Sequence, residues 1–211
     1  MPAPTTDLLA EVAAYYSAKL AEHGPTPRGV DWNGAESQAL RFEQLGRIVD
    51  TASHFSINDI GCGYGALLDF LATRHTAFSY TGVDVSAEMV RAASQRHQSR
   101  ANARFMQAAT PGETADYGIA SGVLNVRLSR PDDEWAGYLE GVLEVLDQTS
   151  ARGFAFNCLT SYSDPDRMRS DLYYADPCAL FDRCKRRYSP HVALLHDYGL
   201  YEFTILVRKQ R

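Results

Sequence analysis

The feature that most constrains the fold of this chain is a glycine-rich stretch between residues 56 and 68. A short apolar segment is followed by alternating glycines at positions 61, 63 and 65, and then by an Ala-Leu-Leu run. This succession predicts a strand, a tight turn and the start of a helix, a unit that brings backbone N–H groups against a nucleotide-like ligand. Glycine suits such a turn because it has no Cβ atom where the chain bends and where a ligand approaches the backbone. We therefore expect a ligand site at this turn.

Acidic residues near the turn help to decide which nucleotide it binds. The pattern Gly61-x-Gly63-x-x-Ala66 taken alone also satisfies the dinucleotide-binding fingerprint. Asp59, two residues before the first glycine, can receive an ammonium group or ordered water but would lie unfavourably beside a pyrophosphate. A second predicted strand, residues 78–83, ends in Asp84, whose carboxylate can accept both hydroxyls of a ribose. A dinucleotide enzyme would share Asp84, so the discriminating feature is Asp59 followed by three glycines.

These two motifs resemble those of the class I S-adenosylmethionine-dependent methyltransferases. Residues 59–65, Asp-Ile-Gly-Cys-Gly-Tyr-Gly, look like the family's first motif, and residues 82–86 followed by Met89 look like its second. Before the first predicted strand, Arg41 can either pair with the cofactor's α-carboxylate or remain solvated. The resemblance implies a transferase that uses S-adenosyl-L-methionine. It also implies further cofactor-binding residues, namely Asp59, Gly61, Cys62, Gly63, Gly65, Asp84, Val85, Met89, Ala109 and Ser121.

Alternating strand and helix patterns after residue 55 predict an α/β fold. After the first strand, strands are expected at residues 78–83, 103–108, 117–122 and 153–159, and helices at residues 66–74, 86–97, 132–149 and 177–187. Two more strands, residues 191–197 and 201–208, are joined by a Tyr-Gly-Leu turn and predict a final antiparallel hairpin, the family's last signature. The expected fold is a seven-stranded, mostly parallel, doubly wound sheet that ends in this hairpin.

The segment before the sheet is predicted to form a helical lid. Apolar residues recur at helical spacing between residues 7 and 23, and a second helix is expected at residues 36–50. In class I enzymes such segments often lie over the methionine end of the cofactor, and a helix packed on the domain edge is the alternative. We expect one domain across residues 1–211, with residues 1–50 as lid and residues 55–211 as Rossmann-like core.

Candidates for contact with the methyl acceptor are side chains near the carboxyl ends of the strands, where ligands of open α/β sheets bind. Tyr16 and Trp32 belong to the lid, Asn125 follows the fourth strand, and His196 and Tyr201 flank the hairpin tip. Each has a structural alternative: Trp32 can be a packing anchor, and Asn125 can form an Asx turn. No catalytic residue is assigned, although His196 beside an acid is the best-placed base.

The end of the third predicted strand departs from the family pattern. Many members place an acid there for the adenine amino group, whereas this chain has Ala108-Ala109-Thr110. Adenine recognition then falls to backbone atoms, to Gln107 or to Thr110. After the fourth strand, the Asn/Asp-Pro-Pro-aromatic tetrad of enzymes that methylate nucleobase or glutamine nitrogens is also replaced, by a Ser-Gly-Val-Leu-Asn run.

Composition limits the expected partners and compartment. The net charge of −5 disfavours a nucleic-acid partner, because phosphate neutralisation needs a basic face. One exception is the basic stretch Arg183 to Arg187, which either complements a helix C-terminus or binds an anionic group. No apolar run approaches the roughly 20 residues of a membrane span, and the N-terminus lacks the regions of a signal peptide, so a cytoplasmic protein is expected. Its four cysteines form no Cys-x-x-Cys pair and are expected to be reduced and free of metal.

Together these features favour methyl transfer to an oxygen or nitrogen of a small molecule, with an anionic metabolite or sugar as one option. A methyltransferase acting on protein or RNA is the first alternative, and a basic groove beside Ser121 would distinguish it. A non-catalytic regulator that senses the cofactor or a nucleoside is the second, and a nicotinamide-dependent oxidoreductase is a distant third. The sequence favours no particular oligomeric state.

Overall fold

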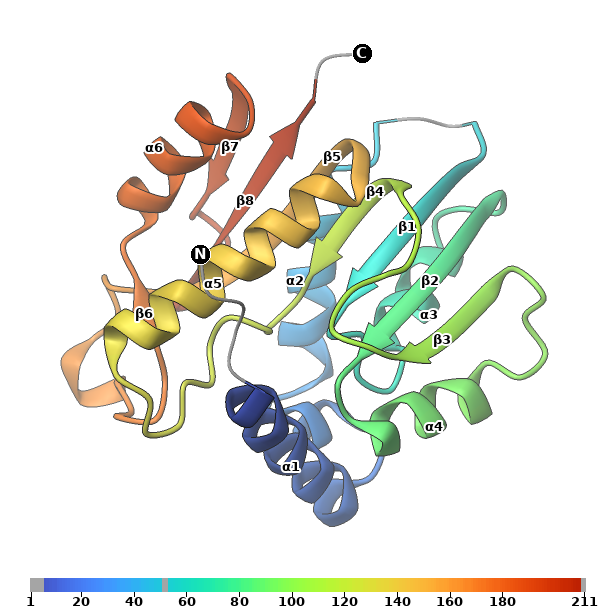
Figure 1. Cartoon of the computed structure of the whole chain (residues 1–211), viewed down its shortest axis with the longest axis horizontal. Helices are drawn as coiled ribbons and strands as arrows, with labels where there is room; N and C mark the ends of the chain where they lie inside the picture. The colour runs from blue at the N-terminus through green and yellow to red at the C-terminus, as the bar shows by residue number, and fades with distance from the viewer. Residues whose placement is uncertain (1–5, 51–52, 210–211) are drawn as a thin grey trace.

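The computed structural model describes residues 6–50 and 53–209 and has a central eight-stranded sheet (Figure 1). The strands lie in the order β3-β2-β1-β4-β5-β8-β7, with β6 paired to β5 beside this path. Their bounds are β1 Phe55–Ile60, β2 Phe78–Asp84, β3 Ala103–Gln107, β4 Ala115–Ala120, β5 Ser150–Thr160, β6 Tyr174–Ala175, β7 His191–Leu195 and β8 Glu202–Arg208.

The pairing confirms a mostly parallel sheet that ends in an antiparallel hairpin. Strands β1 to β5 pair in parallel along the path, whereas β8 is antiparallel to both β5 and β7. The seven predicted strands are all present. The structure adds β6, which was not predicted because two residues are too few to show a strand pattern. Because the order reverses between β1 and β4, a crevice forms at the carboxyl ends of these two strands.

Six α-helices and two short 3₁₀ segments belong to the described part of the chain. They are α1 Thr6–His23, η1 Pro27–Val30, α2 Ala35–Gly46, α3 Ala66–Ala72, α4 Ala87–Arg96, α5 Asp132–Gln148, η2 Pro165–Arg167 and α6 Pro177–Arg187. The predicted N-cap Ser86 accepts a hydrogen bond from the backbone N–H of Met89 at 3.1 Å, which fixes the start of α4. The helix expected to reach residue 50 ends at Gly46, because the next residues form tight turns that bury Ile48.

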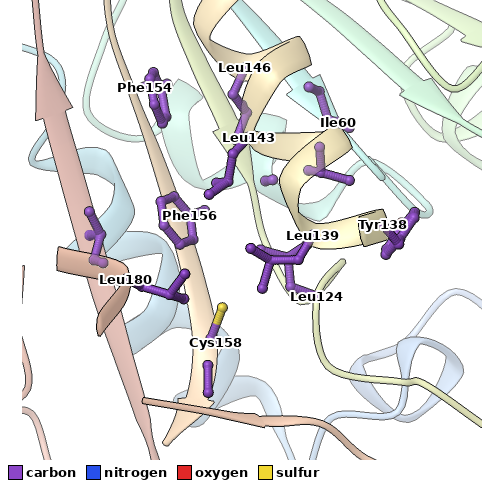
Figure 2. Packing of buried hydrophobic residues seen from close by; sticks show 14 of the residues in the cluster. Ile60, Leu124, Tyr138, Leu139, Leu143, Leu146, Phe154, Phe156, Cys158 and Leu180 are labelled. Atoms are coloured by element: carbon purple, nitrogen blue, oxygen red, sulfur yellow. The ribbon is translucent and has the colours of Figure 1, made fainter. Parts of the chain in front are cut away.

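Apolar side chains cover both faces of the sheet, as the near-continuous apolar strands require. On one face α5 presents Leu139, Leu143 and Leu146 toward Phe154 and Phe156 of β5 (Figure 2). On the other face α2 and α3 pack on β1, β2 and β4 through a second buried cluster, which includes Phe42, Leu45, Leu67, Leu68, Phe55, Tyr80 and Tyr117. Burying a side chain of this size contributes about 1.5–3 kcal/mol, so the two layers hold the strand ends rigidly around the crevice.

Helix α1 lies at the edge toward which the arrows of β1, β2 and β3 point in Figure 1. Ser17 in α1 hydrogen-bonds the Ser86 hydroxyl at 2.9 Å and the Glu88 carboxylate at 3.0 Å. Farther toward its start, Glu11 forms an ion pair with Arg130 in the loop before α5. The helix is therefore tied to both sides of the crevice. The first five residues of the predicted lid lie outside the described residues.

Within residues 6–50 and 53–209, no helix combines the length and apolarity that crossing a bilayer demands.

Candidate functional site

The glycine-rich turn between β1 and α3 has the backbone shape that its glycines allow. Gly61, Gly63 and Gly65 have φ values of +70°, +53° and +83°, in the left-handed region. A Cβ atom on Gly61 would lie 2.4 Å from Cγ2 of Val123, so a side chain does not fit there. The N–H groups of Gly61 and Cys62 donate to the carbonyl of Val83 at 2.8 and 3.0 Å, which fastens the turn to β2.

A cavity of about 670 Å³ adjoins this turn, within the size range of small-molecule sites. It is lined by most of the predicted cofactor residues, namely Asp59, Gly61, Cys62, Gly63, Asp84, Val85, Met89, Ala109 and Ser121. Two of the predicted acceptor-side residues, Tyr16 and Trp32, also line it. The turn, the end of β2, helix α1, η1 and α5 thus converge on one space.

Asp59 is a buried carboxyl at the base of the cavity. Its Oδ2 accepts a hydrogen bond from the Tyr80 hydroxyl at 2.5 Å, while Oδ1 has no partner within residues 6–50 and 53–209. Burial, with a smaller contribution from the charge of Asp84, raises the pKa of Asp59 to about 7. An ammonium group placed here would satisfy Oδ1 and favour the ionised carboxylate.

Asp84, at the end of β2, contacts the backbone of the glycine turn. Its Oδ2 accepts from the N–H of Gly63 at 2.9 Å and its Oδ1 accepts from the N–H of Ser86 at 2.9 Å. Burial raises the pKa of Asp84, and the backbone N–H groups partly offset this effect. Each carboxylate oxygen keeps acceptor capacity beyond one backbone bond, so hydroxyl groups of a ligand can also be bound.

The β3–β4 connection, residues 108–114, contains no helix and brings Ala108, Ala109 and Thr110 to the cavity. Gln107, the other side chain considered for adenine, is exposed and donates to the carbonyl of Val85 at 3.2 Å. Thr110 and the backbone of residues 108–110 are therefore placed to meet a ligand, and Gln107 is not among the lining residues. At the end of β4, the buried Oγ of Ser121 has no hydrogen-bond partner in the described part of the chain.

Gln38 and Tyr64, which are not among the predicted site residues, also line the cavity. Both side chains are buried, and the Tyr64 hydroxyl donates to Oε1 of Gln38 at 3.1 Å. Tyr64 occupies a variable position inside the glycine motif, and Gln38 is a polar residue on the buried face of α2. The signal available in the sequence was a glutamine on the helix face that also carries Phe42 and Leu45.

The structure does not bring Arg41 to the cavity wall. Its Nε and Nη2 donate to the Glu202 carboxylate at 2.7 and 2.5 Å, so the charge has a partner inside the protein. The sequence left open a cofactor contact and a solvated arginine. No local pattern indicated the pair with Glu202, which lies 161 residues away and reaches Arg41 only when β8 joins β5.

Three acceptor-side candidates also lie away from the cavity lining. Asn125 is buried, and its Oδ1 accepts from the N–H of Leu159 at 3.0 Å. His196 is exposed and packs beside the rings of Tyr162 and Phe203. Tyr201 is exposed and its hydroxyl donates to Asp164. The hairpin tip therefore forms a separate surface.

The basic stretch at the end of α6 is paired with carboxylates. Arg183 pairs with Glu140 and Arg187 with Glu144, both on α5, while Arg186 pairs with Asp182 on its own helix. Of these cations, Arg187 alone is a lining residue. Within the described ranges, no group of three or more potential metal ligands gathers.

The fold and the site together define a class of protein. A parallel sheet in the order 3-2-1-4-5 with an antiparallel final pair, a glycine turn after β1 and an acid at the end of β2 are the features of class I methyltransferases. Residues 57–149 match the family model described as a methyltransferase domain.

Known proteins agree with this class. The chain is 66% identical over 163 residues to a Mycobacterium tuberculosis protein that bears the name of a methyltransferase, and the match covers 77% of this chain and 98% of that protein. It is 32% identical over 137 residues to the trans-aconitate 2-methyltransferase of Paracidovorax citrulli, covering 58% of this chain and 47% of that protein. The magnesium protoporphyrin IX methyltransferase of Synechocystis PCC 6803, solved with bound S-adenosylmethionine, has a similar fold, with a TM-score of 0.66, 16% identity and coverage of 99% of this chain and 100% of that chain. The chain belongs to the class I S-adenosylmethionine-dependent methyltransferase family.

Proposed function

We propose that the protein transfers a methyl group from S-adenosylmethionine to an oxygen or nitrogen of a small, largely apolar molecule. The observation that carries this proposal is the continuity of the cavity, which runs from the glycine turn to a space beneath α1. Beyond the turn its lining is mostly apolar or aromatic and includes Leu9, Val12, Tyr16, Val123, Tyr138 and Val142.

Two carboxylates and one hydroxyl are the proposed polar contacts of the cofactor. Oδ1 of Asp59, which has no partner in the described residues, suits the amino group of the methionine part, and the Asp84 carboxylate suits the ribose hydroxyls. Oγ of Ser121, likewise without a partner in that part of the chain, supplies a third polar contact at the end of β4. These unsatisfied buried atoms support the fit, because a buried polar atom without a partner costs about 1–3 kcal/mol.

The lid is proposed to restrict the acceptor to a small molecule. Helix α1 contributes Leu9, Val12 and Tyr16 to the cavity and is tied to its rims through Glu11 and Ser17. An acceptor must then fit between α1 and the sheet edge. The carboxylate partners of the α6 arginines favour an apolar acceptor over recognition of an anionic metabolite or sugar by that cluster.

Positioning is the main contribution that we propose for the protein. The sulfonium of the cofactor supplies an activated methyl group, so the chain must align the acceptor and exclude water rather than provide a nucleophile. Alignment of this kind can be worth roughly 7–11 kcal/mol. Burial raises the pKa of Tyr16 well above its ordinary value, so its hydroxyl keeps its proton and can donate a hydrogen bond to the acceptor.

We also propose a cytoplasmic location. The four cysteines are unpaired and three of them are buried, which is typical of a protein kept in a reducing compartment.

The test is release of S-adenosylhomocysteine from S-adenosylmethionine in the presence of panels of small apolar alcohols, acids and amines. We expect turnover with at least one class, and a lower rate with the Asp84→Ala variant when the cofactor concentration is below saturation. Transfer of a labelled methyl group to the protein or RNA fraction of a lysate, with none to small molecules, would contradict the proposal. Binding without turnover on any acceptor would support a regulator instead.

A further inference from the structure

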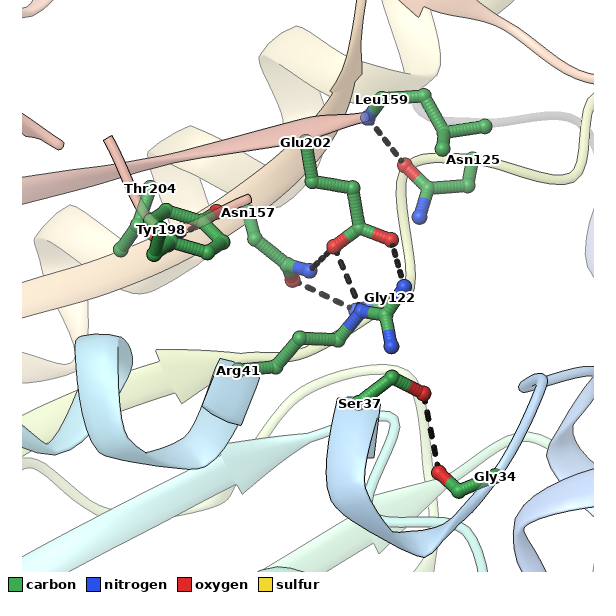
Figure 3. A network of polar contacts seen from close by, with 10 residues as sticks. All are labelled: Gly34, Ser37, Arg41, Gly122, Asn125, Asn157, Leu159, Tyr198, Glu202 and Thr204. Atoms are coloured by element: carbon green, nitrogen blue, oxygen red, sulfur yellow. Dashed lines mark hydrogen bonds and ion pairs between the residues drawn. The ribbon is translucent and has the colours of Figure 1, made fainter. Parts of the chain in front are cut away.

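A buried ion pair joins two distant elements beside the cavity. Arg41 of α2 and Glu202 at the start of β8 are 8% and 3% exposed, and two N–H donors of the guanidinium meet both oxygens of the carboxylate (Figure 3). Such a fork-to-fork contact fixes orientation as well as distance. The remaining nitrogen of the guanidinium, Nη1, has no partner among the residues that the structure describes.

One arm of this network reaches the backbone at the cavity. Oε2 of Glu202 also accepts from Nδ2 of Asn157 at 2.6 Å, and Oδ1 of Asn157 accepts from the N–H of Gly122 at 2.9 Å (Figure 3). Gly122 follows β4, lines the cavity and has a φ of +76°. The hydrogen bond that the Gly122 N–H donates to Asn157 therefore holds the chain in the left-handed turn next to Ser121.

The other arm reaches the same place through an aromatic ring. The guanidinium carbon of Arg41 lies 3.8 Å from the centre of the Trp32 ring, which also lines the cavity. The ring lies so close to Gly122 that a Cβ atom there would be 2.6 Å from Cζ2 of Trp32. Trp32 and Gly122 thus form one piece of the cavity wall, and both are held by the Arg41–Glu202 pair.

We propose that Arg41, Glu202 and Asn157 are positioning residues for methyl transfer, which hold Trp32 and Gly122 as a rigid wall of the cofactor cavity. This inference rests on the proposed function, since that function names the ligand of the cavity. Stability alone is a weak reason for the pair, because well-packed apolar residues in place of a buried ion pair are often as stable or more so. An apolar pair would lack the planar cation that stacks on Trp32 and the oxygen that orients Asn157.

The test compares variants by calorimetric titration with S-adenosylmethionine and by the emission of Trp32. The double variant Arg41→Met/Glu202→Gln removes both charges together and leaves no unpaired buried charge. Arg41→Lys keeps the charge but loses the fork and the stacking. Arg186→Met is the matched control, since it breaks an exposed arginine–carboxylate pair on α6. Trp32 emission is obtained in each background by subtracting the spectrum of the same protein carrying Trp32→Phe, because Trp135 is the other tryptophan.

We expect the folded double variant to bind S-adenosylmethionine about tenfold more weakly, equal to about 1.4 kcal/mol. Its Trp32 emission should move to longer wavelength as the ring gains access to water, and Arg41→Lys should show the same two changes to a smaller extent. Arg186→Met should match the native protein. If the double variant does not fold, the affinity and the Trp32 emission of Arg41→Lys test the inference.

Folded variants with native affinity and native Trp32 emission would overturn the inference while leaving the proposed function intact. If the native protein itself does not bind S-adenosylmethionine, the proposed function and the inference fail together.

Discussion

Among single residues, Asp59 has the surroundings that best suit a cationic group of a ligand. Folding buries this carboxyl beside Tyr80 and leaves one oxygen without a partner in the described residues. The pKa of about 7 means that the ligand-free protein holds a proton that an unfolded chain releases near pH 4. Bound ammonium would reverse this preference.

Cofactor stabilisation should therefore depend on pH. As pH rises from about 4 to about 7, the free energy of unfolding contributed by Asp59 in the ligand-free protein decreases, because the folded state binds the proton more tightly, and it levels off above pH 7. The increase in melting temperature on adding S-adenosylmethionine should be larger at about pH 7.5 than at about pH 5.5. Asp59→Asn should lose this difference. An equal increase at both pH values in the native protein would contradict the assignment of Asp59.

Asp84 should contribute more directly to affinity. Asp84→Ala removes an acceptor for the ribose hydroxyls and frees the N–H groups of Gly63 and Ser86. We expect cofactor binding to weaken by about 1.5–3 kcal/mol, measured by calorimetry. A folded Asp84→Ala protein with unchanged affinity would remove the basis of the second motif.

Substitution of Gly63 can distinguish the effect of backbone strain from the effect of ligand contact. An alanine there is strained at a φ of +53° and places its Cβ 3.2 Å from Val30 of η1. Gly199 at the hairpin tip is the matched control, with a φ of +71° and no atom within 4 Å of an added Cβ. Both alanine variants should lose about 1–2 kcal/mol of stability in chemical denaturation. Loss of cofactor binding is expected for Gly63→Ala alone, and equal affinities in the two variants would argue against contact at the turn.

At the scale of elements, α1 is the part of the structure whose role as a lid can be measured. Because Val12 and Tyr16 line the cavity, a bound ligand should slow amide exchange across α1, while β7, which contributes no lining residue, serves as the internal control. Arg130→Met removes the Glu11 contact and should speed exchange in α1 with a stability loss below about 1 kcal/mol. Saturation with S-adenosylmethionine that leaves exchange in α1 unchanged would contradict the lid.

Local patterns explain why most of the element order was predictable. The glycine motif, the Ser86 cap and the apolar periods of α5 each act within a few residues, and all three appear as expected. The short β6 and the early end of α2 were missed, since a two-residue strand has no period and the end of α2 depends on burial of Ile48.

The fold of the whole molecule determines the charge partners of the arginines, which local sequence patterns could not indicate. Arg41 and Glu202 become partners through the pairing of β8 with β5, and the α6 arginines meet carboxylates of α5 that lie 43 residues earlier. For each arginine the sequence left two interpretations open, a structural role and contact with a ligand. Charge pairing across elements therefore limited the prediction of the acceptor side, whereas the cofactor side depends on short motifs.

The central claim is that the cavity beside the glycine turn binds S-adenosylmethionine. Calorimetric titration of the native protein with S-adenosylmethionine, S-adenosylhomocysteine and NAD tests it most directly. We expect micromolar binding of the first two ligands and none of NAD, with both affinities reduced by Asp84→Ala. Binding of NAD without binding of either sulfur compound would contradict it.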